Sequence, residues 1–466
     1  MEKSTQVNKL HPKNPGHDLD KTSFQPVRIG EIEISKPLPT FPTLFGNSDR
    51  RYKQARILVR LFSYPLGLVD VSLEREINPD YLANLIWQEL HQPITACLKR
   101  FGGSQIKQLS AEGISSVEYE RFLVEQKQLL KKTPFVSVIV CTRDRCEQLA
   151  TCLSRLSTLE YSNYEIIVVD NAPKTTLIAE LIREKYGSVQ NIRYCCEEHP
   201  GLSWARNCGL NNTDAEIVAY IDDDTVPDSR WLIELVKGFQ HEENVGCVTG
   251  MILPAKLETQ AQDWFEQYGG HSKGRGFDQL TFNKESLNNQ SPLFPNPPYG
   301  AGANMAFKTS ILRELGGFDL ALGAGTNTKG GEDTASFYDI LMQGYTLVYN
   351  PAAFVYHFHR RSYVELSNQF YGYGLGLTAF YTRCLLKDPK TLFEIICLFP
   401  RGIALFFRRR IIQTENPGYS FPSALIRTKI RGMISGPWAY LKSLQNLSWM
   451  IKNDGTQNRK NLRLDQ

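Results

Sequence analysis

The hydrophobic pattern of the chain changes near residue 134. From there on, short continuous apolar runs alternate with stretches in which apolar residues recur every three or four positions. The runs at 135–140 and 164–169 are typical of strands buried on both faces of a sheet, and the stretch between them predicts an amphipathic helix. The alternation continues to the apolar run at 217–221. It predicts an α/β domain over 134–385, with a Rossmann-like, mostly parallel sheet flanked by helices.

Two smaller segments precede this domain. Residues 1–51 are rich in Lys, Pro, Ser, Thr and Asn and show little apolar periodicity, so we expect a disordered arm. Residues 52–130 hold two strand-like runs joined by a turn, followed by an amphipathic helical stretch that starts near Asn78. This pattern predicts a small α+β module at the N-terminal side of the α/β domain.

Residues 386–466 predict a helical extension after the α/β domain. The apolar runs at 392–399 and 403–407 are interrupted by charged residues and by Pro400, so they are too short and too charged to span a membrane. Three consecutive arginines follow at 408–410. Packing against the α/β domain and an interfacial helix on an anionic membrane both fit this pattern.

Composition narrows the class of protein. Lys and Arg total 53 and Asp and Glu total 49, a net charge of +4 that is dispersed along the chain, so no nucleic-acid partner is expected. The ten cysteines lack paired spacing, which favours buried thiols in a reducing compartment over disulfides or a cysteine zinc site. The polar N-terminus and the lack of a long apolar run predict a cytoplasmic protein. Peripheral contact with the inner face of the membrane stays open as an alternative.

Three consecutive carboxylates, Asp222, Asp223 and Asp224, end the apolar run at 217–221. Adjacent carboxylates repel one another, and a hard divalent cation such as Mg2+ or Mn2+ offsets this repulsion while it binds phosphate oxygens. Ligands of open parallel sheets bind beyond the carboxyl ends of the strands, where these aspartates would lie. One interpretation is therefore a site for a metal and a diphosphate. The other is a solvated acidic turn before a helix near Pro227.

Two common nucleotide-binding classes are disfavoured. No Gly-x-Gly-x-x-Gly follows the first strand of the domain, and no glycine-rich loop ends in Gly-Lys-Ser or Gly-Lys-Thr. The sequence therefore argues against a dinucleotide-dependent oxidoreductase and against a P-loop NTPase.

Five short blocks occur in the order and spacing of family 2 glycosyltransferases: 136–143, 167–171, 201–207, 220–224 and 330–333. Each block alone is a weak signal, whereas five in register are specific. Over roughly residues 134–385 the chain resembles this family. The resemblance implies a GT-A fold and a nucleoside-diphosphate sugar as the donor, with a UDP-sugar expected.

The resemblance also implies which residues contact the donor. Asp170, after the second strand, would accept the ring N–H of the base, and Thr142 and Arg143 would line the same pocket. Arg206 would lie beside the base or the diphosphate, to which a guanidinium is suited. The local alternatives are a turn at the strand end for Asp170 and a surface salt bridge for Arg206.

The consecutive aspartates match the Asp-x-Asp motif of the family. This match implies that Asp224 is a direct metal ligand, that Asp222 lies nearer the ribose or in the outer metal shell, and that Asp223 lies beside the donor. His357, after a strand-like run, would complete a site for Mn2+ or Mg2+. The metal would bridge the two phosphates of the donor and neutralise the departing diphosphate. The alternative for His357 is an ordinary polar strand end.

Glu332 and Asp333 follow two glycines and precede an apolar helical stretch. By the resemblance, Asp333 is the catalytic base that removes a proton from the acceptor hydroxyl, with Glu332 as its neighbour in the site. The alternative is a helix N-terminus, where carboxylates are favoured without any catalytic role.

These implications predict an inverting, metal-dependent hexosyl transfer to a hydroxyl of a glycan or lipid-linked acceptor, in polysaccharide biosynthesis. Two other classes stay open. A non-catalytic relative would bind a nucleotide sugar or a glycan as the partner of another transferase. A nucleotidyltransferase with two metals would explain Asp222 to Asp224, but it gives no account of Glu332 and Asp333.

Overall fold

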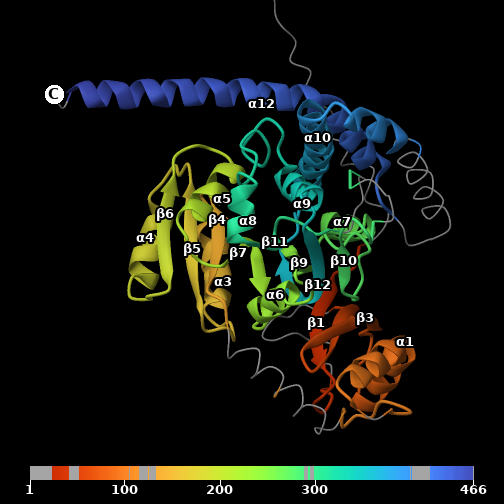
Figure 1. Cartoon of the computed structure of the whole chain (residues 1–466). Helices are drawn as coiled ribbons and strands as arrows, with labels where there is room; N and C mark the ends of the chain where they lie inside the picture. Colours follow the sequence, from red (N-terminus) through yellow and green to blue (C-terminus); the bar gives the residue numbers. More distant parts are fainter. Residues whose placement is uncertain are drawn as a thin grey trace, which may run out of the picture.

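The computed structural model describes residues 24–40, 52–103, 105–114, 124, 133–287, 292–293, 299–398, 400 and 420–464 (Figure 1).

A nine-stranded mixed sheet forms the centre of the α/β domain. Its strand order is β10-β12-β9-β11-β7-β4-β5-β6, with β8 paired to β12. Neighbouring pairs among β6, β5, β4 and β7 are parallel, as are β9 and β12, whereas β11, β8 and β10 run antiparallel to their partners. The predicted α/β domain is therefore confirmed, with a sheet in which four strand pairs are parallel and four are antiparallel. The strands are β4 Val136–Thr142, β5 Tyr164–Asn171, β6 Ile192–Glu197, β7 Ile217–Asp222, β8 Thr225–Pro227, β9 Val245–Pro254, β10 Leu280–Phe282, β11 Asn304–Lys308 and β12 Thr346–His357.

Helices cover both faces of this sheet. Alternate residues of β4 enter different cores: Val138 packs in a cluster with Leu153 and Trp231, and Ile139 packs in one with Ala205 and Phe337. A continuous apolar run is what a strand buried on both faces requires, and this explains the pattern from which the domain was predicted. The helices are α3 Cys146–Leu156, α4 Leu177–Leu181 continued by η3 Ile182–Tyr186, α5 Leu202–Asn211, α6 Trp231–Phe239, α7 Gln260–Gln267, α8 Thr309–Glu314 and α9 Glu332–Met342.

The N-terminal module has a three-stranded sheet in the order β1-β2-β3 beside one helix, α1. Its elements are β1 Val27–Glu33, β2 Gln54–Leu61, β3 Tyr64–Ser72 and α1 Pro79–Arg100. The expectation of a disordered arm over 1–51 is wrong for β1. This strand pairs in parallel with β2, and a parallel partner needs no adjacent turn signal, so local sequence reasoning missed it.

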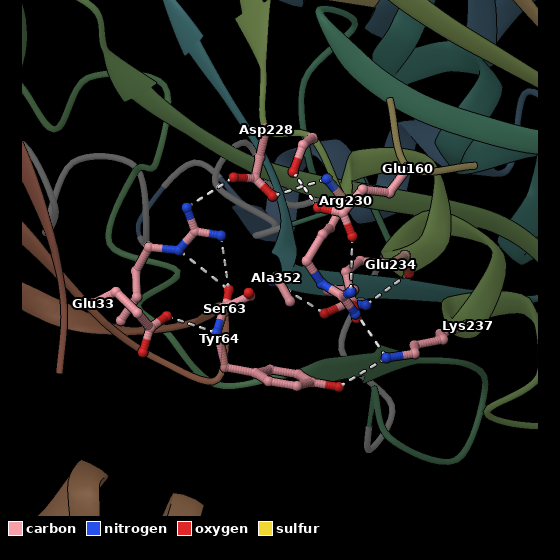
Figure 2. Close-up of polar contacts among 12 residues, drawn as sticks. Glu33, Ser63, Tyr64, Glu160, Asp228, Arg230, Glu234, Lys237 and Ala352 are labelled. Atoms are coloured by element: carbon pink, nitrogen blue, oxygen red, sulfur yellow. Dashed lines mark hydrogen bonds and ion pairs between the residues drawn. The ribbon is translucent and has the colours of Figure 1, made fainter. Parts of the chain in front are cut away.

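The N-terminal module docks against the back of the α/β sheet through β12 and α6. Arg60 Nη1 lies 2.8 Å from a carboxylate oxygen of Asp228, and the same guanidinium packs over the Phe354 ring. Figure 2 shows Lys237 of α6 reaching Tyr64 of β3, with Lys237 Nζ donating to the Tyr64 hydroxyl at 3.1 Å. Ionic, polar and cation–π contacts therefore fix the module to the segment that follows the three aspartates.

Helices form the C-terminal region, as predicted, and residues 391–398 are among those that are helical. α12 Ser423–Leu464 extends along one side of the molecule and packs closely against α10 Tyr363–Lys387 (Figure 1). A Cβ at Gly374 of α10 would overlap the Lys429 carbonyl of α12, so glycine is needed for this approach. No helix in the described residues is long and apolar enough to cross a membrane. Of the predicted interfacial segment at 392–410, residues 399 and 401–410 lie outside the described residues.

Replacing Arg60 by Met should weaken the docking of the N-terminal module. The side chains of Arg60 and Asp228 are 13% and 8% exposed, so the change leaves a nearly buried carboxylate without its cation. Unpairing a fully buried charge costs about 3–5 kcal/mol, and we expect roughly 2 kcal/mol for this partly exposed pair. Urea denaturation followed by circular dichroism measures the loss. The matched control is Arg56→Met, which breaks the exposed pair with Asp70 and should cost less than about 1 kcal/mol. Equal losses in the two variants would contradict a buried docking contact.

Candidate functional site

A cavity of about 620 Å3 opens where the carboxyl ends of β4, β5 and β7 meet the N-terminus of α9. This is the edge at which open α/β sheets bind ligands, and the volume is in the range of small-molecule sites. All the sequence-predicted site residues except Asp170 line it: Thr142, Arg143, Arg206, Asp222, Asp223, Asp224, Glu332, Asp333 and His357.

Asp223 points into the protein from the turn between β7 and β8. Its carboxylate accepts hydrogen bonds from Thr142 Oγ1 at 2.8 Å and from Arg145 Nη1 at 3.0 Å. Burial raises the pKa of Asp223 to about 6, with the neighbouring aspartates adding to the effect against Arg145. Asp223 therefore anchors the turn to β4, and the side chain of Thr142 is occupied by this contact.

Asp222, Asp224 and His357 bring their ligand atoms within 4.8 Å of one another. The register of β8 against β12 pairs Thr225 with His357, and this places the histidine beside the aspartate turn. His357 Nε2 lies 3.2 Å from Asp224 Oδ1. Carboxylate oxygens with one imidazole are a donor set that suits Mn2+ or Mg2+, so the residues present fit a divalent cation.

The charges of this trio are strongly coupled. Burial alone would raise the pKa of Asp224, but His357 and Arg145 hold that pKa well below its usual range. Burial would lower the pKa of His357, yet the Asp224 carboxylate outweighs it and the pKa is raised. Burial and the Asp224 charge raise the pKa of Asp222. Asp224 and His357 thus stabilise the charged form of each other.

Arg206 of α5 is buried beneath the cavity. Its Nη1 lies 3.0 Å from Glu332 Oε1, and its Nη2 donates to the Gly302 carbonyl at 3.1 Å and lies 3.8 Å from Asp222 Oδ1. The guanidinium also packs over the Phe318 ring. The exposed salt bridge considered for this residue is therefore wrong, because Arg206 compensates two carboxylates from below. Its predicted contact with the donor stays a prediction.

Glu332 and Asp333 begin α9 and take different environments. Glu332 is buried, and burial raises its pKa to about 7 against the attraction of Arg206. Its Oε2 has no hydrogen-bond partner among the described residues. Asp333 accepts a hydrogen bond from Gly302 N at 2.8 Å and one from Thr334 N at 2.7 Å, and it faces the cavity. Asp333 is therefore the member of the pair that a cavity ligand can reach most directly.

The residues predicted to bind the nucleotide base differ in their exposure to the cavity. Asp170 is fully buried and does not line the cavity, whereas its neighbour Asn171 does. The Tyr194 hydroxyl donates to Asp170 Oδ2 at 3.1 Å, and Oδ1 has no partner among the described residues. Burial raises the pKa of Asp170. Arg143 is exposed at the cavity rim, and the roles assigned to Asp170 and Arg143 stay predictions.

Several basic residues that were not among the predicted site residues also line this cavity. Arg145 and Arg360 each lie within three residues of a predicted site residue, so proximity to the motifs was a usable signal. Lys273, Lys329 and Lys429 come from loops and from α12, and no local pattern marks them. Together with the predicted Arg143 and Arg206, the arginines and lysines around the cavity are Arg145, Lys273, Lys329, Arg360 and Lys429.

Part of the domain that carries this cavity is similar to known proteins. The sequence model of "Glycosyl transferase family 2" matches residues 137–316. Glucosyl-dolichyl phosphate glucuronosyltransferase of Haloferax volcanii is 24% identical over 195 residues, 40% of this chain and 57% of that protein. Beta-monoglucosyldiacylglycerol synthase of Nostoc sp. is 35% identical over 128 residues, 26% of this chain and 27% of that protein. The chain thus spans less than two thirds of the length of either relative.

Among solved structures, mannosyltransferase PcManGT from Pyrobaculum calidifontis, in complex with GDP-Man and Mn2+, aligns at 18% identity with a TM-score of 0.45, over 68% of this chain and 94% of that one. The family match covers β4, β5 and β7, whose ends supply Thr142 and the three aspartates. The segment that holds these strands, residues 137–316, is therefore similar to glycosyl transferase family 2.

Proposed function

We propose that the protein is an inverting, metal-dependent glycosyltransferase that moves a sugar from a nucleoside-diphosphate donor to a hydroxyl of a glycan or lipid-linked acceptor. One observation carries this proposal. The trio of Asp222, Asp224 and His357 shares a single cavity with Asp333, so a cation site and a carboxylate base face the same space.

The donor would bind with its diphosphate toward the aspartate trio. Asp222, Asp224 and His357 would hold Mn2+ or Mg2+, which would supply charge neutralisation at the leaving diphosphate. The basic residues around the cavity offer further cationic partners for phosphate oxygens, among them Arg145 and Arg360. With leaving-group charge compensated in this way, no separate general acid is required.

Asp333 would receive the proton of the acceptor hydroxyl. Two backbone N–H groups, of Gly302 and Thr334, hold its carboxylate in place. A Cβ added at Gly302 would lie 2.7 Å from Arg206 Nη2 and 3.3 Å from Asp333 Cβ, so glycine leaves room for both side chains. A fixed base beside the reacting hydroxyl suits a single displacement, which inverts the anomeric centre.

Nucleoside-diphosphate release separates this proposal from its alternatives. With a matching UDP-, GDP- or dTDP-sugar, an acceptor and Mn2+, we expect release that Asp333→Asn slows by roughly 10²–10⁴-fold, because the general base is lost. Asp224→Ala should abolish the metal-dependent release. Asp333→Asn should still bind the donor when binding is measured by calorimetry. Asp214→Asn, on the exposed surface, is the control and should match the wild type.

Each other outcome points to another class. Release of pyrophosphate would indicate a nucleotidyltransferase. Donor binding without turnover across a broad acceptor panel would favour a non-catalytic binding partner. Full activity of Asp333→Asn would contradict the assignment of the base.

Metal affinity should rise as the pH increases from 5 to 7. Metal ligands must be deprotonated, burial raises the pKa of Asp222, and the Asp224 charge raises the pKa of His357. Protons therefore compete with the cation at low pH and leave the site as the pH rises. Mn2+ titration by electron paramagnetic resonance should show affinity rising about tenfold or more over this window. Equal affinity at pH 5 and pH 7 would contradict the coupling, and His357→Gln should flatten the profile.

We further propose that α12 holds the enzyme on an anionic membrane, where a lipid-linked acceptor would lie. The inner side of α12 packs on α10 and buries Leu425 and Tyr440. Its outer side exposes a second apolar stripe, in which Ile434 and Trp438 are each 76% exposed and Trp449 is 67% exposed. A helix that is apolar on two opposite sides needs a second apolar environment.

Charge favours a lipid surface as that environment. Residues 423–453 contain no Asp or Glu, and Arg427, Arg431, Lys442 and Lys452 are exposed. Basic residues beside exposed Trp and Ile are typical of helices that lie in the interface of an anionic membrane. Lys429 of the same helix lines the cavity, so the helix links the proposed membrane side to the site.

Co-sedimentation with vesicles tests this surface. The protein should bind vesicles of phosphatidylcholine with 30% phosphatidylglycerol, and the double variant Ile434→Ser, Trp438→Ser should bind at least tenfold more weakly, because each side chain loses about 1.5–3 kcal/mol of apolar burial. Leu177→Ser removes an exposed apolar residue of α4 and should bind as the wild type does. Absence of vesicle binding, or a dimer that the double variant disrupts, would overturn the membrane assignment.

A further inference from the structure

Three histidines meet beside the aspartate trio. His271 follows α7, and His357 and His359 lie at the end of β12 and just beyond it. One ring nitrogen from each lies within 4.8 Å of the others. The rings of His271 and His357 have centroids 4.6 Å apart. The cluster therefore offers three imidazole ligands around one point.

The spacing of two of these nitrogens matches a tetrahedral cation. His357 Nδ1 and His359 Nδ1 are 3.4 Å apart. Zinc binds imidazole nitrogen at about 2.0–2.1 Å, and two such ligands in a tetrahedron lie about 3.3 Å from each other. This separation is long for a hydrogen bond between two rings, whereas it is the ordinary distance between neighbouring zinc ligands.

In two of the three histidines, the ring nitrogen that faces away from the cluster contacts a carboxylate. His359 Nε2 lies 2.9 Å from Glu266 Oε1, and His357 Nε2 lies 3.2 Å from Asp224 Oδ1. A carboxylate on one nitrogen fixes the tautomer in which the other nitrogen carries its lone pair toward a metal. Both Nδ1 atoms are thus oriented as ligands, and the outer contacts of a zinc site are already in place.

His271 supplies the third ligand. Its Nε2 is buried without a hydrogen-bond partner among the described residues, although buried ring nitrogens are ordinarily paired. His271 lines the cavity, so an ion can reach it from there.

We propose that His271, His357 and His359 bind Zn2+ in a second cation site, distinct from the Asp222 and Asp224 site, with a water from the cavity as the fourth ligand. Three imidazoles select Zn2+ over Mg2+ and Mn2+, which prefer oxygen ligands. The two sites share His357. When its Nδ1 binds zinc, its Nε2–H donates to Asp224, so His357 is withdrawn from the donor cation.

Cobalt substitution tests the site without an activity measurement. Co2+ added to the metal-free full-length protein should give the intense visible absorption of a tetrahedral centre, and one equivalent of Zn2+ should abolish it. His271→Gln and, independently, His359→Gln should each lower Co2+ and Zn2+ affinity at least tenfold. Asp222→Asn, which alters only the aspartate trio, should leave the absorption unchanged. His241→Gln, an exposed histidine, is the surface control.

Two results would overturn the proposal. One is visible absorption that Asp222→Asn removes and His271→Gln preserves, because zinc would then occupy the aspartate trio. The other is the weak absorption of an octahedral centre in a wild-type protein that is folded by circular dichroism. Since the readouts are binding and spectra, they stand whether or not the protein transfers a sugar.

Discussion

The repulsion among five carboxylates at one sheet edge governs the organisation of this site. Asp222, Asp223 and Asp224 end β7, and Glu332 and Asp333 begin α9. Each is compensated from a separate direction. Arg206 pairs with Glu332, Arg145 with Asp223 and His357 with Asp224. The backbone N–H of Gly302 donates to Asp333. The compensation is incomplete, because burial still leaves the pKa of Glu332 near 7. An edge in this state gains stability from an added cation.

The sequence predicted those parts of the molecule whose structure is set by residues close together in the chain. The continuous apolar runs specified the buried strands. The consecutive carboxylates at a strand end pointed to Asp222 and Asp224, which the fold brings beside His357, and their binding of a metal stays a prediction. Prediction from the sequence failed where contacts join distant segments. β1 was missed because its partner is parallel, and Lys429 was missed because α12 reaches the cavity from more than 90 residues beyond Asp333. His271 lies in a stretch without periodicity, and only the fold brings it to His357.

Single residues at this site serve more than one neighbour. Arg206 contacts Glu332 and Asp222, and Asp223 joins Thr142 to Arg145. His357 faces Asp224 with one nitrogen and His359 with the other. Substitutions here are therefore expected to be non-additive, because each one removes a shared partner. Roles assigned from single variants need double-mutant cycles to separate them.

The contact between Lys429 and Tyr268 has a consequence for the order of folding. Lys429 Nζ donates to the Tyr268 hydroxyl at 2.9 Å, which joins α12 to the segment after α7. Chains leave the ribosome from the N-terminus, at about 5–20 residues per second, and domains generally fold as units during synthesis. Every strand of the sheet precedes α12 in the sequence. During synthesis the strands and their carboxylates are therefore made before the part of the cavity wall that α12 supplies, and the site of a nascent chain lacks this wall until α12 has been translated.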